Sequence, residues 1–119
     1  AVHSRRREQR TVAAKLPGMV TAGLVTANEA TWLGSLATRK QAIAAAQSFG
    51  GKNAARATKR FAAQVVELAF VKDRIDRGFG NPEVDALFNE ETQALRATRA
   101  ASGPALQWLT GYRVVAPPR

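Results

Sequence analysis

A long stretch of helical periodicity near the middle of the chain limits the possible folds most strongly. Across residues 53–78, apolar residues recur at steps of three and four, which places their side chains on one face of a helix. That face consists of Phe61, Val65, Val66, Leu68, Ala69, Phe70 and Ile75. An apolar face this broad is typical of a helix that is buried on more than one side. We therefore predict a long central helix over residues 53–78, with the other segments packed around it.

Charge spacing and composition agree with an all-α fold. Lys72 and Asp76, like Asp73 and Arg77, have the four-residue spacing of helical ion pairs. Aromatic residues make up only 7% of the chain, and β-branched residues do not alternate over strand-length runs. A length of 119 residues suits one domain with a single small core. We expect residues 1–119 to form that domain, with residues 1–7 and 115–119 loosely held.

The first helix is predicted over residues 4–16. It is expected to end at Pro17-Gly18, because proline lacks an amide hydrogen and disfavours helix in the residue before it. A turn-like linker over residues 17–26 follows. Its apolar residues are expected to reach the core, and they are Met19, Val20, Leu24 and Val25.

The second helix is predicted from a capping box. Thr26 and Glu29 have the spacing at which the hydroxyl accepts the amide of the glutamate, and the carboxylate accepts the amide of the threonine. The helix should begin at Ala27 and break near Ala37. Its apolar face would present Ala30, Trp32, Leu33 and Leu36.

A third helix is predicted over residues 39–49 with Thr38 as its cap. Gly50-Gly51 should close it, since glycine is the usual residue at a left-handed helix end. We expect this helix to bury Ile43, Ala46 and Phe49.

The last helix is predicted over residues 82–101. Asn81 is a favoured N-cap residue, Pro82 suits the first helical position, and Gly103-Pro104 should stop the helix. Its expected apolar face comprises Val84, Leu87, Phe88, Ala94 and Leu95. The sequence therefore predicts a compact all-α bundle of about five helices around the long central helix.

The net charge of +9 is unevenly distributed along the chain. Residues 1–16 are basic apart from Glu8, residues 39–60 contain no acid, and residues 81–103 are acidic on balance. Such a field attracts nucleic acid, anionic lipid or acidic proteins. The helix start that follows Gly50-Gly51, with Lys52, Arg56 and Arg60 near, is interpreted as a helix cap with basic surroundings, and anion capture there is the alternative.

Catalytic and metal-binding patterns are missing from the sequence. Cysteine is absent, and His3, the one histidine, lies near the chain start. Glu90 and Glu91 are adjacent, so on a helix their side chains would point about 100° apart and could not work as a pair. We therefore predict no catalytic residue, no metal site and no cofactor.

Part of the chain resembles a known family. The matching features are Leu16-Pro17, Ala22-Gly23-Leu24-Val25-Thr26, Glu29, Leu33, Ser35-Leu36, the basic helix that follows, Phe61, Val66-Glu67-Leu68-Ala69, Arg74 and Arg77-Gly78. Over residues 4–78, this pattern resembles the C-terminal region of actinobacterial PrsW-family intramembrane metalloproteases. In that family an arginine-rich segment follows the last transmembrane helix, and a proline-glycine turn and a Thr-x-x-Glu cap come next.

The resemblance implies a cytosolic, non-catalytic accessory domain of a multi-pass membrane protease. The peptidase motifs of the family lie in its membrane part, and none is present here: Glu90-Glu91 lacks the following lysine. The chain begins with alanine, and we interpret it as a piece cut from a longer membrane protein or as a processed product. It has no apolar run near the roughly 20 residues that cross a bilayer.

Two binding functions follow as hypotheses. In the first, a basic face docks on the anionic inner leaflet or on an acidic protein through Arg5, Arg6, Arg7, Arg10, Lys52 and Arg56. In the second, a nucleic-acid-binding module makes nonspecific phosphate contacts through Arg39, Lys40, Lys52, Arg56, Lys59 and Arg60. A purely structural role in the parent protein stays open, with an interface around Trp108 and Tyr112.

Overall fold

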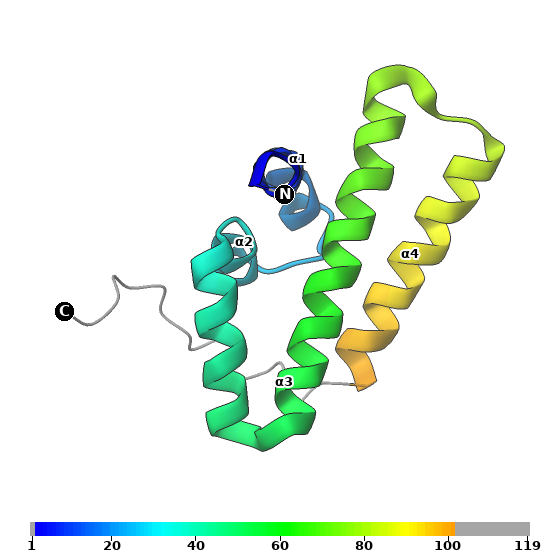
Figure 1. The fold of residues 1–119 in the computed structure, drawn as a ribbon. Coiled ribbons are helices and arrows are strands. Elements are labelled where there is room, and N and C mark those ends of the chain that lie inside the picture. The colour runs from blue at the N-terminus through cyan, green and yellow to red at the C-terminus, as the bar shows by residue number, and fades with distance from the viewer. Residues whose placement is uncertain (1, 102–119) are drawn as a thin grey trace.

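A computed structural model describes residues 2–101 of the chain, and every regular element in that range is helical (Figure 1). The compact all-α fold is thus confirmed. The elements in chain order are α1 (Val2–Thr21), α2 (Ala27–Leu33), α3 (Leu36–Arg74), a π-helical turn η1 (Ile75–Phe79) and α4 (Pro82–Ala101). Within these described residues there are therefore four α-helices rather than about five. The predicted third and central helices both lie in α3.

A bend at Gly50 and Gly51 divides α3 into two arms. Gly50 has φ −133° and ψ 15°, and Gly51 has φ 74° and ψ −162°, so neither residue is helical. At this Gly-Gly bend the ribbon reverses its direction (Figure 1). We call residues 36–49 the first arm and residues 52–74 the second arm. The predicted break is present, but as a bend inside one element.

The conformation of Gly51 leads to a testable prediction. Its dihedral angles lie in a region that is essentially restricted to glycine, so Gly51→Ala should lower the free energy of unfolding by about 1–3 kcal/mol. Urea unfolding followed by circular dichroism measures this change. Gly18→Ala is the control, because Gly18 lies inside α1 and alanine there should raise stability by roughly 0.5–1 kcal/mol. Equal unfolding midpoints for the two variants would contradict the prediction.

The first helix is longer than predicted, because Pro17 lies inside α1 instead of ending it. Pro17 is exposed, so the carbonyl group that loses its helical hydrogen bond to proline faces solvent and can bond to water. The proline is therefore tolerated inside the helix. The helix ends later with two capping bonds, from Leu24 N to Met19 O (2.9 Å) and from Gly23 N to Val20 O (3.0 Å). Gly23 has φ 74°, as this cap requires. Met19 and Leu24 are buried together in the core, as the sequence predicted.

Two of the predicted caps are confirmed and one is wrong. Glu29 N donates to Thr26 Oγ1 (3.1 Å) and Thr26 N donates to Glu29 Oε1 (2.8 Å), which completes the capping box of α2. Val84 N donates to Asn81 Oδ1 (2.9 Å), and α4 has the predicted bounds. Thr38, however, is buried inside α3. Ser35, which has an extended backbone, caps α3 instead and accepts Thr38 N at 3.3 Å.

The core lies between α1, α2 and the second arm, and α4 packs along that arm (Figure 1). Most of the predicted apolar face of the central helix is buried, whereas Val66, Phe70 and Ile75 are only partly so. From the first arm, Ala42 and Ala46 are fully buried. Leu95 is the one fully buried residue that α4 contributes.

The prediction that Phe49 is buried is wrong. Phe49 is 70% exposed, because it lies at the last turn of the first arm, next to the Gly-Gly bend, where the chain turns away. Ile43 is only partly buried. The predicted helix stop at Gly103-Pro104 and the predicted interface at Trp108 and Tyr112 lie outside the described residues.

Candidate anion-docking surface

The second arm of α3 carries four cations on its solvent side. They lie at steps of three and four residues along the first turns after the bend, and all four side chains are exposed. We call this group the cationic strip, and it consists of Lys52, Arg56, Lys59 and Arg60. Thr58 and Phe61, on the opposite face of the same turns, are fully buried. The backbone that carries the strip is therefore held in place by packing on the opposite face of the helix.

None of the ion pairs among the described residues includes a cation of the cationic strip. At the far end of the second arm, Lys15 Nζ lies 2.7 Å from Asp76 Oδ2, and Arg77 Nε lies 3.0 Å from Asp73 Oδ2. The hydrogen bond from Lys15 lowers the pKa of Asp76. The predicted pair of Lys72 with Asp76 is also present, at 3.4 Å.

This distribution makes the second arm electrically asymmetric. Near η1, acids on α3 and at the start of α4 offset the basic residues. Near the bend, the cationic strip has no carboxylate partner within the part of the chain that the structure describes. Along the second arm, the positive potential is therefore strongest near the bend.

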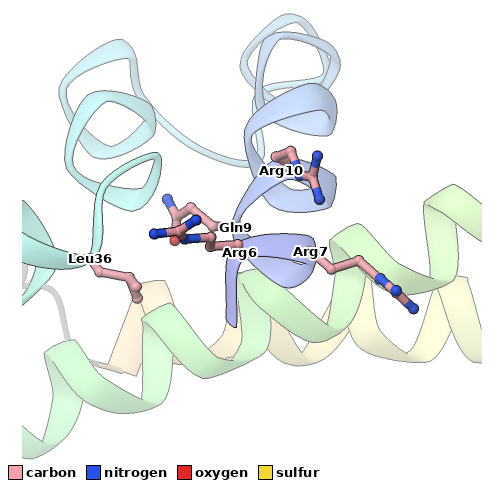
Figure 2. A pocket seen from close by; sticks show the side chains of 5 residues that line it. All are labelled: Arg6, Arg7, Gln9, Arg10 and Leu36. Carbon is pink, nitrogen blue, oxygen red and sulfur yellow. The ribbon is translucent and has the colours of Figure 1, made fainter. Parts of the chain in front are cut away.

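The arginines of α1 form a second basic region. Arg6, Arg7 and Arg10 line a surface hollow of about 480 Å³ together with Gln9 and Leu36. Figure 2 shows that the three guanidinium groups diverge: Arg6 lies with Gln9 toward Leu36, whereas Arg7 extends the opposite way. The hollow therefore adds positive potential but does not bring several donors onto one anion.

The two basic regions are separate. In Figure 1, α1 is seen almost end-on beside the middle of the molecule, whereas the Gly-Gly bend forms its lower end. The predicted membrane-facing set thus divides into the α1 arginines and, on α3, Lys52 and Arg56. Arg5 belongs to the first turns of α1, and its side chain is outside the described part.

Arg39 is only partly exposed, and its guanidinium group is engaged by a neighbouring helix. Its Nη2 donates to Gln9 Oε1 at 3.0 Å, and Gln9 Nε2 donates to Leu33 O at 3.4 Å. Burial lowers the pKa of Arg39, while the Glu8 carboxylate has a smaller, opposing effect. Of the predicted nucleic-acid set, the other five cations, including Lys40, are exposed.

A polar cluster that the sequence did not reveal joins α2 to α4. Arg99 Nη1 donates to Glu29 Oε2 at 3.0 Å, and Arg99 Nη2 donates to Glu29 Oε1 and, at 3.0 Å, to Leu24 O. The Arg99 Cζ atom lies 4.9 Å from the centroid of the Phe61 ring. Glu29 is 2% exposed, so this cluster holds α4 to the core. One signal was available: Glu29 is the only acid between Glu8 and Glu67.

No group of metal-ligating side chains is found among the described residues, and no helix in that range is long and apolar enough to cross a bilayer. Comparison of the chain with protein-family models, curated proteins and solved structures finds no match. The resemblance of residues 4–78 to the PrsW family therefore stays a prediction. What the geometry provides is an exposed basic surface on a rigid helix.

Proposed function

We propose that this helical module docks on an anionic membrane surface through the cationic strip. In this proposal it is a non-catalytic accessory domain on the cytosolic side of a PrsW-like intramembrane protease. The observation that carries the proposal is the strip itself: four exposed cations on one helix, without a carboxylate partner in the described residues. The PrsW-like parent chain rests on the sequence resemblance alone.

The expected affinity is modest. Each Lys or Arg close to an anionic leaflet contributes about 1 kcal/mol, so four such contacts give roughly 4 kcal/mol and a dissociation constant near 1 mM. A free domain would therefore bind weakly. A domain that is attached to membrane-spanning segments has a high effective concentration at the surface, where weak contacts suffice. Its arginine-rich start would lie at the attachment point.

Nonspecific nucleic-acid binding is the competing function. It would use the same strip together with Lys40, and phosphate contacts would make it strongly dependent on salt. Arg39 is only partly exposed and is held by Gln9, so it is less available to phosphates than the nucleic-acid hypothesis assumed. An acidic protein is a further possible partner. Binding to vesicles of pure anionic lipid would show that no such protein is needed, and a lack of binding would leave an acidic protein as a candidate partner.

Charge reversal at two matched positions tests the proposal. Arg56 and Arg74 are both exposed on the second arm, about five whole helical turns apart, so they face the same way. Arg56→Glu and Arg74→Glu lower the net charge equally. We expect Arg56→Glu to weaken binding to anionic vesicles about 30-fold, since it replaces about 1 kcal/mol of attraction by repulsion of similar size. Arg74→Glu should weaken it less than about threefold.

Cosedimentation with vesicles of neutral or anionic lipid at low salt provides the measurement. Equal losses in the two variants would show that only net charge matters and would contradict a role for the strip. No retention on anionic vesicles, together with salt-sensitive binding to duplex DNA, would favour the nucleic-acid function instead.

A further inference from the structure

One aromatic side chain is exposed at the apex of the Gly-Gly bend. Phe49 directly precedes Gly50 and is 70% exposed. The bend forms one end of the molecule in Figure 1, where the two arms of α3 meet. The neighbouring Gln47, Ser48 and Lys52 are also exposed, so among residues 2–101 Phe49 is the one large apolar side chain exposed at the apex.

The charges around the apex are all positive. Residues 30–66, which span the whole first arm and the second arm as far as Val66, contain no acid. The cationic strip begins immediately beyond the bend with Lys52 and continues with Arg56. An aromatic ring beside lysine and arginine suits the boundary between lipid headgroups and acyl chains, where the ring is buried and the cations meet phosphates.

The other highly exposed phenylalanine provides an internal comparison. Phe79, at 61% exposure, lies in η1 at the opposite end of the second arm. Its ring is contacted by Arg77, with 5.5 Å between Cζ and the ring centroid, and Arg77 is paired with Asp73. Phe79 thus has an arginine over its ring and an acid nearby, whereas Phe49 has no arginine or lysine over its ring among residues 2–101, and no acid lies within its own arm.

We infer that the Gly-Gly bend inserts Phe49 into the headgroup region of an anionic bilayer, with the cationic strip alongside on the lipid phosphates. This inference rests on the proposed function and adds an orientation to it: the bend faces the membrane, and η1 and the start of α4 point away. On duplex nucleic acid the ring would have to wedge between base pairs at an unstacking cost of a few kcal/mol, and single-strand binding would require several stacking aromatics.

Vesicle binding of two phenylalanine variants tests the orientation. We expect Phe49→Ala to weaken binding to anionic vesicles about tenfold, because an interfacial ring contributes about half of the effect of full burial. Phe79→Ala should change binding less than twofold. Circular dichroism checks that both variants are folded. Equal effects of the two substitutions would overturn the inference.

A site-specific label gives a second, independent readout. The chain contains no cysteine, so Ser48→Cys and Asn89→Cys each create a unique site for an environment-sensitive fluorophore. Both positions are exposed, Ser48 beside the apex and Asn89 on α4. With anionic vesicles, we expect a blue shift and quenching by lipid-borne quenchers at residue 48 only. If Arg56→Glu abolishes vesicle binding but neither label responds, the insertion of Phe49 is wrong and the docking proposal stands. If the protein does not bind vesicles, both fail.

Discussion

Replacing Arg99 by alanine is expected to lower the free energy of unfolding by about 2–4 kcal/mol, because a buried carboxylate would lose its cation. Glu29 is 2% exposed and would retain only the hydrogen bond from Thr26 N, the N-cap residue of α2, among the bonds described above. The substitution also removes the bond to Leu24 O and the contact with the Phe61 ring. The Arg99 side chain is 34% exposed, so the loss of stability should be smaller than for a fully buried ion pair.

Arg96→Ala is the matched control for this substitution. Arg96 lies one turn earlier on α4 and is exposed, so its loss should change stability by less than about 0.5 kcal/mol. Urea unfolding followed by circular dichroism compares the two variants. In a double-mutant cycle with Glu29→Gln, the coupling energy should exceed about 1 kcal/mol, since the two side chains are in direct contact. If Arg99→Ala proved no more harmful than Arg96→Ala, the cluster would have no role in stability.

Phe61→Ala is expected to have the largest effect, a loss of about 3–5 kcal/mol. Phe61 is fully buried in the second arm, within the core cluster, and the Arg99 guanidinium lies over its ring. Alanine would leave a cavity among neighbours that several helices hold in place, so the surroundings could close it only partly. Domains of this size have a total stability of about 5–15 kcal/mol, so the variant should unfold at a much lower urea concentration.

Phe49→Ala and Phe79→Ala are the controls for this prediction, because they remove the same atoms from exposed positions. Each should lie within about 0.5 kcal/mol of the parent protein. The comparison also establishes that the Phe49 variant of the vesicle experiment is fully folded. If Phe61→Ala and Phe49→Ala unfolded at the same urea midpoint, the packing described for Phe61 would be wrong.

The fold and the proposed docking surface depend on the same bend. The Gly-Gly bend lets the alanine-rich first arm return toward the core, and it also leaves Phe49 and the cationic strip at one end of the molecule. Gly51→Ala should therefore affect both stability and vesicle binding. Substitutions on the strip itself, such as Arg56→Glu, should affect binding with little change in stability, because that side chain is exposed.

The sequence by itself determined the features that depend on neighbours within about four residues. The Thr26–Glu29 capping box, the cap at Asn81, the i,i+4 ion pairs and the apolar face of the central helix all follow from the geometry of a single helix. The break at Gly50-Gly51 was also predictable, since it reflects the conformational freedom of glycine. The bounds of α4 were predicted for the same local reasons.

Only the tertiary structure decided the features that depend on how distant segments pack. Pro17 stays within α1 because the helical hydrogen bond that it lacks lies on the solvent side, where water can replace it. Continuing the helix past Pro17 also buries Met19 in the core. Arg39 is partly buried against Gln9 of α1, and Arg99 reaches Glu29 across 70 residues of sequence. In each case the energy comes from burial and from partners that another helix supplies, and residue spacing within one helix carries no information about either.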